Sequence, residues 1–262
     1  MALTPKNTVQ MNKMRAACRL AAEVLDYITP HVKAGVSTLD LNNLCNEFIL
    51  RNNAISATLG YHGYPSHSCI SRNEIVCHGI PSADERLQEG DILNIDITVI
   101  KNGFFGDTSR MYEVGPVDPK AHTLVTTTHA AMLAGIATVK SGSYLNEIGN
   151  AIEAVCAPKG YGIVQDYCGH GIGDKFHTAP QILHYANTAF RNQRLKKGLT
   201  FTVEPMVNLG SWRTELMNDG WTVKTADRSL SAQWEHTIAV TEDGTEILTL
   251  SPEYGLHPPF SQ

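Results

Sequence analysis

Two aspartates lie inside a stretch that otherwise has the composition of two β-strands, LNIDITVIKNGFFGDTSRM at residues 93–111. Aspartate is depleted from strand interiors, and an unpaired buried carboxylate is costly unless it takes up a proton or finds a partner. Asp96 and Asp107 therefore need compensation, and a bound cation would supply it.

The Asn-Gly pair at 102–103 predicts a hairpin with a two-residue type I′ turn. Continuing its ladder places Asp107 opposite Thr98, which shares a face with Asp96 because side chains alternate with period 2. Such diagonal neighbours lie roughly 7–8 Å apart. In dinuclear metal sites the ions are about 3.5–4 Å apart, a spacing that carboxylates can bridge. The alternative is that one aspartate caps a turn and the other pairs with Arg110.

Three further residues could join such a site. Glu204 ends the apolar run LTFTVE and is followed by a proline, and Glu235 lies among strand formers in QWEHTIAV. His170 lies in CGHGIG, where glycines allow a backbone to approach an ion closely. Each residue alone has an ordinary structural explanation, but together they predict a metal site with five ligands: Asp96, Asp107, His170, Glu204 and Glu235.

The composition is that of a globular chain large enough to bury a sizeable core. It has 262 residues, 42% hydrophobic and 18% charged, with a net charge of -5 and no run of Lys or Arg. Neither a nucleic acid nor an anionic membrane is implied as a partner. The first thirty residues predict an amphipathic core helix without a signal-peptide core, and no stretch approaches about 18 apolar residues in a row. We therefore expect a cytoplasmic protein.

The six cysteines do not suggest a disulfide framework or a zinc site. None forms a CxxC pair, and most lie in apolar surroundings, which favours reduced, buried thiols. They are Cys18, Cys45, Cys69, Cys77, Cys156 and Cys168.

The chain also resembles itself. Three pairs of segments match in the same order: VKAGVSTLDLNNLCNEFI at 32–49 with VKSGSYLNEIGNAIEAVC at 139–156, CHGI at 77–80 with GHGI at 169–172, and EGDILNID at 89–96 with KGLTFTVE at 197–204. This predicts one domain over 1–262, built from two α+β halves at approximately 10–115 and 116–250. The same alignment makes His78 the counterpart of His170 and thus a candidate sixth ligand.

Several segments together resemble the type I methionine aminopeptidases of metallopeptidase family M24. They are GYHGYP at 60–65, NEIVCHGIP at 73–81, NIDITVIKNGFFGDTS at 94–109, YCGHGIG at 167–173, FTVEPMVN at 201–208, DGWTVKTADRSLSAQWEHT at 219–237 and EILTL at 246–250. The resemblance spans essentially the whole chain and favours the short bacterial form. It implies the pita-bread fold, in which two pseudo-twofold halves place helices outside a curved antiparallel sheet.

The resemblance also implies roles for the five ligands. Asp96 would bind the first of two divalent metal ions, His170 and Glu204 would bind the second, and Asp107 with Glu235 would bridge them. Oxygen ligands with one imidazole suit manganese, iron, cobalt or zinc. Two such ions can lower the pKa of a bridging water from 15.7 to about 7 and so supply hydroxide as the nucleophile.

Further catalytic and binding residues follow from the same resemblance. His177 would donate a hydrogen bond to the scissile carbonyl oxygen, Glu204 would shuttle a proton, and His78, here without a metal, would contact the leaving-group side. The substrate pocket would comprise Thr58, Tyr61, Tyr64, Cys69, His78, Phe176, His177 and Trp221. Thr58 occupies a position where relatives carry cysteine, which should make the pocket wall slightly more polar.

The expected substrate is the N-terminus of a peptide or nascent chain. A methionine side chain fits a slot lined by aromatic rings and a thiol, and the resemblance restricts the second residue to small ones. It also allows the ribosome as a partner and favours a monomer.

Three rival interpretations stay open. The first is an Xaa-Pro aminopeptidase or dipeptidase of the same fold, although these usually carry an added N-terminal domain. The second is a non-catalytic peptide-binding module of that fold, and the third is a dinuclear phosphoesterase in which Arg110 would contact phosphate. The C-terminal SPEYGLHPPFSQ at 251–262 is expected to be a loosely held tail.

Overall fold

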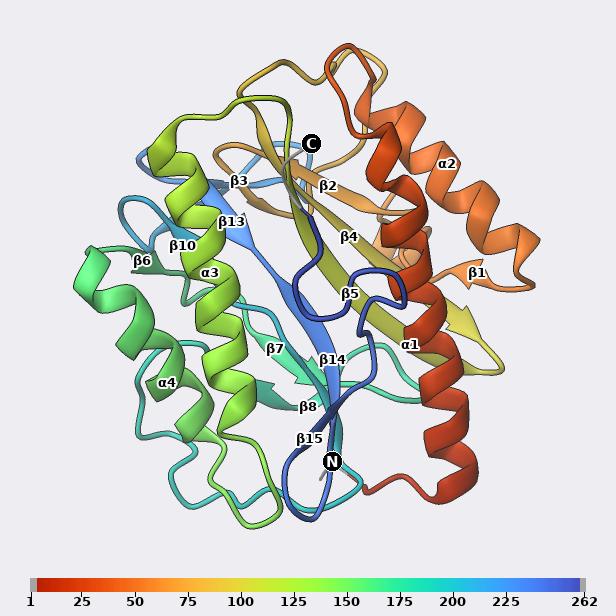
Figure 1. Cartoon of the computed structure of the whole chain (residues 1–262), viewed down its shortest axis with the longest axis vertical. Helices are drawn as coiled ribbons and strands as arrows, with labels where there is room; N and C mark the ends of the chain where they lie inside the picture. Colours follow the sequence, from red (N-terminus) through yellow and green to blue (C-terminus); the bar gives the residue numbers. More distant parts are fainter. Residues whose placement is uncertain (1–3, 260–262) are drawn as a thin grey trace.

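A computed structural model describes residues 4–259 and shows an α+β fold built on a large antiparallel sheet (Figure 1). The strand order is β1-β4-β5-β14-β9-β7-β8, with β2 paired to β4 and β15 to β14. The strands are β1 (Ile55–Ser56), β2 (Cys69–Arg72), β4 (Ile92–Lys101), β5 (Phe104–Glu113), β7 (Gly169–Gly171), β8 (Thr178–Ile182), β9 (Thr200–Val203), β14 (Glu235–Val240) and β15 (Thr245–Ile247). The predicted fold class is confirmed.

Two small sheets flank the large one. The first contains β13 (Ser231–Gln233), β10 (Met206–Asn208) and β6 (Gly162–Ile163), and the second contains β11 (Thr214–Leu216), β12 (Val223–Thr225) and β3 (Ile75–Cys77). Short 3₁₀ turns are η1 (Thr29–His31), η2 (Tyr61–Gly63) and η3 (Ala157–Lys159).

Four helices lie on one face of the large sheet, in two pairs (Figure 1). They are α1 (Thr8–Ile28), α2 (Thr38–Arg51), α3 (Pro119–Ala137) and α4 (Asn146–Cys156). Helix α1 packs on α2 and on strands β4 and β5, while α3 packs on α4. Within residues 4–259 no helix combines the length and the apolar character needed to cross a membrane. The duplication of the two halves remains a prediction.

The predicted amphipathic helix near the N-terminus is present as α1, and its buried face contacts the strand that carries Asp107. Met14 and Cys18 are fully buried in this core. A Cβ atom at Gly106 would collide with the backbone of Ala17, so only glycine lets α1 rest this closely on β5. This contact sets the distance between α1 and β5 at the residue next to Asp107.

The hairpin register predicted from the Asn-Gly turn is confirmed. Asn102 and Gly103 have φ values of 54° and 76°, as a type I′ turn requires. Asp107 pairs with Thr98 across the β4–β5 ladder, so Asp96 and Asp107 project from the same face of the sheet.

Arg110 does not pair with either aspartate, so that alternative is wrong. Its guanidinium lies 2.7 Å from the carboxylate of Asp26 on α1, and the arginine side chain is only 4% exposed. Arg110 is three residues from Asp107 on the same strand and therefore faces the opposite side of the sheet. It is directed toward the helices, where it could not contact a phosphate bound beside the aspartates.

The C-terminal segment is anchored as far as it is described, contrary to expectation. Ser251 Oγ donates to both carboxylate oxygens of Asp26, at 2.8 and 2.9 Å, and the Tyr254 ring centroid lies 5.9 Å from the guanidinium of Arg110. Residues 260–262 lie outside the described part of the chain.

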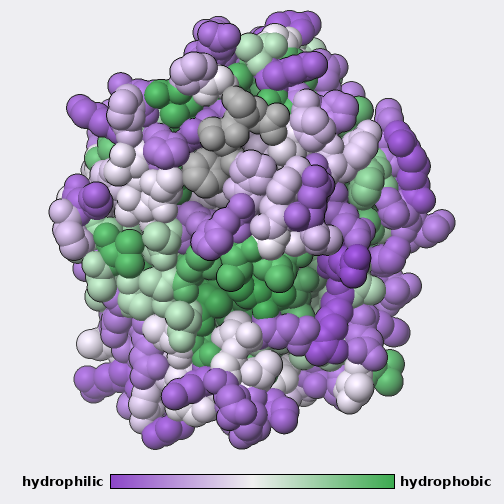
Figure 2. Space-filling view, viewed as in Figure 1, coloured by the Kyte–Doolittle hydropathy of each residue, from purple (hydrophilic) through white to green (hydrophobic). Residues whose placement is uncertain are grey.

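Hydrophobic residues gather near the middle of the face that carries the helices (Figure 2). They lie between α1 and α3, where Figure 1 shows β15 and the segment after it.

All six cysteines are free thiols. Five are buried and Cys168 is half-buried. The prediction of buried thiols therefore holds for five of the six cysteines.

Candidate active site

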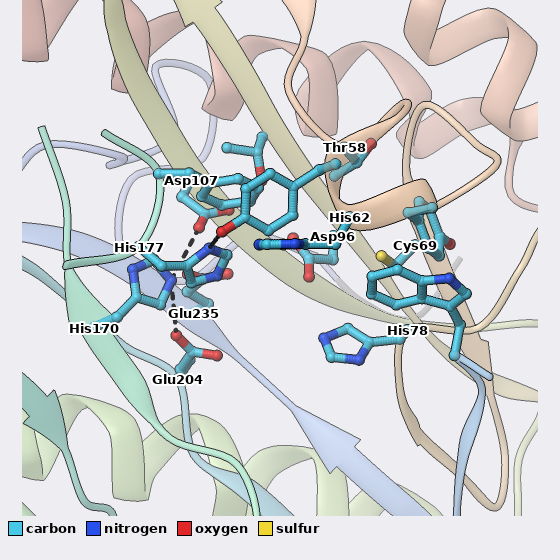
Figure 3. Close-up of a pocket in the computed structure, with 15 residues that line it drawn as sticks. Thr58, His62, Cys69, His78, Asp96, Asp107, His170, His177, Glu204 and Glu235 are labelled. Carbon is cyan, nitrogen blue, oxygen red and sulfur yellow. Dashed lines mark hydrogen bonds and ion pairs between the residues drawn. The ribbon is translucent and has the colours of Figure 1, made fainter. Parts of the chain in front are cut away.

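The five predicted ligands come from five strands that are consecutive in the sheet, β4-β5-β14-β9-β7. Asp96 lies on β4, Asp107 on β5, Glu235 at the start of β14, Glu204 directly after β9, and His170 on β7. Antiparallel neighbours bring distant parts of the chain side by side, so residues 96 and 235 meet on one face. Figure 3 shows the five side chains converging there.

The distances within this cluster are those of a site that can hold cations. His170 Nε2 lies 3.5 Å from Asp107 Oδ2 and 3.6 Å from Glu204 Oε1. Ligand atoms of Asp107, His170 and Glu235 all lie within 4.8 Å of one another. Asp96 Oδ1 and Glu235 Oε1 are buried and have no hydrogen-bond partner among the described residues. Unpaired buried carboxylate oxygens are expensive, and divalent ions would satisfy them.

Hydroxyl groups from the neighbouring strand positions donate hydrogen bonds to two of these candidate ligands. Thr98 Oγ1 donates to Asp107 Oδ1 at 2.7 Å, and Thr202 Oγ1 donates to Glu204 Oε1 at 2.6 Å. The backbone N–H of His170 donates to the same threonine at 2.9 Å. Such outer contacts hold metal ligands in their binding orientation.

The charges in the cluster shift one another's protonation. Burial, followed by repulsion from Asp107 and Glu204, raises the pKa values of both Asp96 and Glu235 well above their usual range. Burial raises the pKa of Glu204 to about 7, although the charge of His170 and the hydrogen bond from Thr202 act in the opposite direction. Burial alone would lower the pKa of His170, but its hydrogen bond to Asp107 and the charge of Glu204 raise it. Carboxylates crowded in this way favour a cation.

His184 supports the site but was not predicted. The backbone N–H of Glu204 donates to His184 Nε2 at 3.1 Å, and the histidine is only 1% exposed. Its sequence context, QILHYAN, gives no sign of this contact because the partners are twenty residues apart. The hydrogen bond fixes the backbone at the point where β9 ends and Glu204 enters the site.

A cavity of about 280 Å³ opens above the cluster. The structure places all five candidate ligands in its wall, together with all eight residues predicted for the substrate pocket: Thr58, Tyr61, Tyr64, Cys69, His78, Phe176, His177 and Trp221. It adds Thr98 and His62, which were not predicted as site residues. His62 adopts a left-handed backbone conformation with φ 48°, and its sequence alone does not reveal which way such a residue points.

The pocket wall is mostly aromatic. The rings of Tyr61 and Phe176 lie 4.8 Å apart, and those of Tyr64 and Trp221 lie 5.2 Å apart edge to face. Thr58 Oγ1 donates to the carbonyl oxygen of Ser66 at 3.0 Å, so its proton is used by the backbone and not by the pocket. The arrangement offers an elongated, apolar side chain a rigid slot.

The two remaining histidines occupy different sides of the cavity. His177 lies against His170, with ring centroids 4.1 Å apart, whereas His78 packs edge to face on Trp221 at 6.0 Å. Within residues 4–259, the group of ligand atoms that lie within 4.8 Å of one another contains Asp107, His170 and Glu235, and it omits His78 as it does Asp96 and Glu204. Figure 3 shows His78 apart from the carboxylates, across the cavity.

A second cavity of about 220 Å³ adjoins the first. Both are lined by His78, His177 and Glu204, and the second adds Tyr167 and Gln233. A peptide bound in the first cavity could therefore extend past His78 and His177 into the second cavity.

Comparison with known proteins identifies the class of this site. The model of metallopeptidase family M24 matches residues 12–242. The chain is 53% identical to the methionine aminopeptidase of Escherichia coli (strain K12), over 95% of each chain. It superimposes on the crystal structure of methionine aminopeptidase from Rickettsia prowazekii with a TM-score of 0.92 and 52% identity, covering 95% of this chain and 100% of the other. The chain therefore belongs to metallopeptidase family M24, in which it groups with the methionine aminopeptidases.

A more distant protein shares the same fold. The prolidase from Pyrococcus furiosus matches with a TM-score of 0.73 at 21% identity, covering 94% of this chain and 65% of the prolidase. At this identity the likeness shows the fold alone. The expected pita-bread architecture is confirmed by the close superposition on methionine aminopeptidase.

Proposed function

We propose that the protein is a dinuclear metal-dependent aminopeptidase that removes the N-terminal methionine from peptides and nascent proteins whose second residue is small. The observation that carries this proposal is the convergence of four carboxylates and one imidazole beneath an aromatic cavity. The sequence identity to the Escherichia coli methionine aminopeptidase supports the choice of substrate.

Asp96 would bind one metal ion, His170 and Glu204 the other, and Asp107 with Glu235 would bridge them. The short distances from His170 to Asp107 and to Glu204 support placing these three around one ion. The unpartnered oxygens of Asp96 and Glu235 support ion binding on their side of the cluster. Cobalt, manganese, iron and zinc all suit this donor set.

Bound divalent ions would act as Lewis acids toward water and the scissile carbonyl. Glu204 would accept the proton of the attacking water and return it to the leaving amine. His177 would donate a hydrogen bond to the carbonyl oxygen as negative charge develops on it. His78, across the cavity, would contact the leaving-group side.

The aromatic wall would select methionine. An unbranched, polarisable thioether fits between rings through dispersion and sulfur–aromatic contacts. Tyr64 and Trp221 on one side and Tyr61 with Phe176 on the other provide such rings. Crowding where the two cavities meet, beside His78 and His177, would exclude large second residues.

The proposal is tested by mass-spectrometric detection of methionine released from Met-Ala-Ser, with Ala-Pro-Ser assayed in parallel. The protein is first stripped with a chelator and then given manganese, iron, cobalt or zinc. Metal-restored cleavage of Met-Ala-Ser alone is the expected result. Cleavage of Ala-Pro-Ser alone would identify an Xaa-Pro aminopeptidase, and no cleavage by the folded, metal-loaded protein would identify a binding module.

A further inference from the structure

A hydrogen bond in the wall of the cavity joins Tyr61 and His177. The tyrosine hydroxyl lies 2.8 Å from His177 Nδ1, and the two residues are 116 positions apart. Tyr61 begins the η2 turn, and His177 immediately precedes β8. The contact therefore joins a 3₁₀ turn to the residue before a strand of the large sheet, two segments far apart in the chain.

Both rings are held by packing. Tyr61 contacts His62 and Phe176, with ring centroids 4.4 and 4.8 Å away. His177 stacks on Phe176 at 4.0 Å and lies 4.1 Å from the ring of His170. His177 is exposed and Tyr61 is half-buried, but these ring contacts and the hydrogen bond together direct Nδ1 of His177 at Tyr61, so Nε2 is the nitrogen left for a substrate.

The direction of this hydrogen bond decides which nitrogen of His177 can donate. A neutral imidazole carries a single N–H, and the partner of one nitrogen sets the role of the other. A tyrosine hydroxyl is protonated at neutral pH, and burial raises the pKa of Tyr61 further. Within residues 4–259 this hydroxyl has no other hydrogen-bond partner, so its proton is available to Nδ1.

We propose that Tyr61 is a positioning residue whose O–H donates to Nδ1 of His177, holding the imidazole in the tautomer that carries its proton on Nε2. That proton then donates to the scissile carbonyl oxygen. The inference rests on the role of His177 in the proposed function, and it gives Tyr61 a task separate from lining the methionine slot. The ring of Tyr61 serves the slot, while its hydroxyl serves the histidine.

The tautomer is measured directly by ¹⁵N NMR of the imidazole nitrogens in the zinc-loaded protein at pH 7.5. In the wild type, His177 should show a protonated Nε2 and an unprotonated Nδ1. Tyr61→Phe keeps the ring, removes only the hydroxyl, and should shift both signals toward a mixture of tautomers. Tyr64→Phe is the matched control, since the Tyr64 hydroxyl donates to the carbonyl oxygens of Ser68 and Gly79 and should leave the His177 signals unchanged.

Kinetics give a second, independent readout. Tyr61→Phe should lower kcat for Met-Ala-Ser by about 3- to 10-fold, the worth of one ordinary hydrogen bond, with KM and zinc content unchanged. A wild-type His177 protonated on Nδ1, unchanged His177 signals in Tyr61→Phe, or a variant impaired in KM alone would each overturn the inference. If the wild type releases no methionine, the proposed function fails while the NMR result still decides the tautomer.

Discussion

Thr98 donates a hydrogen bond of 2.7 Å to Asp107, directly opposite it on the β4–β5 ladder. Thr98 is 1% exposed and Asp107 4% exposed. One carboxylate oxygen of Asp107 is thus engaged by the protein, while the other faces His170. The hairpin register places the hydroxyl of Thr98 against the carboxylate of Asp107, a candidate metal ligand.

Replacing this donor should weaken metal binding without unfolding the protein. Thr98→Val keeps the shape of the side chain but removes the hydroxyl, and we expect metal affinity to fall by at least about 10-fold, as for other contacts that orient ligands. Competition with a chromophoric chelator measures the affinity. Thr98→Ser retains the hydroxyl and is the control. Equal affinities for Thr98→Val and the wild type would show that the hydrogen bond does not orient Asp107.

Metal binding should release protons and should stabilise the protein more at higher pH. The folded-state pKa values of Asp96, Glu204 and Glu235 are raised, to about 7 for Glu204. Without metal, the folded protein therefore holds protons that the unfolded chain loses near pH 4, so these groups reduce stability as pH rises from about 4 toward 7. Bound metal ions would neutralise the carboxylates and so remove this loss of stability at higher pH.

The difference in Tm between metal-loaded and metal-free protein should accordingly be larger at pH 7.5 than at pH 5.5. Taking the difference in Tm cancels the contribution of any histidine that titrates equally in the metal-loaded and the metal-free protein. Calorimetric titration in buffers of different ionisation enthalpy counts the protons released at pH 6. A difference in Tm that does not grow with pH, together with no proton release, would contradict these pKa shifts.

His177→Ala should separate catalysis from metal binding. Loss of one donor to a developing oxyanion typically lowers kcat by about 10²–10³-fold, while metal content, measured by elemental mass spectrometry, should stay as in the wild type. His31→Ala, on the η1 turn outside the cavity, controls for loss of a histidine. A parallel loss of metal and activity would instead make His177 part of the metal site.

Arg110→Met should destabilise the fold without affecting catalysis. The substitution leaves the buried carboxylate of Asp26 without its cation, which typically costs about 3–5 kcal/mol. Denaturant unfolding measures the loss, and the double variant Asp26→Leu/Arg110→Met should recover part of it. The kcat of the folded protein should be unchanged, because Arg110 is directed away from the site. A loss of kcat would mean that the ion pair shapes the active face.

The sequence predicted the parts of this site that depend on local rules. The Asn-Gly turn and the two-residue alternation were enough to place Asp96 and Asp107 on one face, and the structure has this register. The runs ending in Glu204 and beginning at Glu235 form strands as expected. These local rules do not give the order of the strands in the sheet, which only the structure shows.

The features that were missed depend on contacts between distant residues. His184 supports Glu204 across a loop, and Ser251 anchors the C-terminal segment to Asp26, 225 residues away. No local pattern encodes such contacts, because each residue has ordinary surroundings in the sequence. Arg110 was a candidate partner for the site only because the sequence does not show the acid on α1 that pairs with it.

In the proposed function, the five side chains hold two metal ions between them. Anomalous diffraction from crystals of the manganese-loaded protein tests it most directly. We expect two peaks about 3.5–4 Å apart, with Asp107 and Glu235 touching both, Asp96 touching one, and His170 with Glu204 touching the other. A single fully occupied peak, or two peaks that do not share Asp107 and Glu235, would contradict the dinuclear assignment.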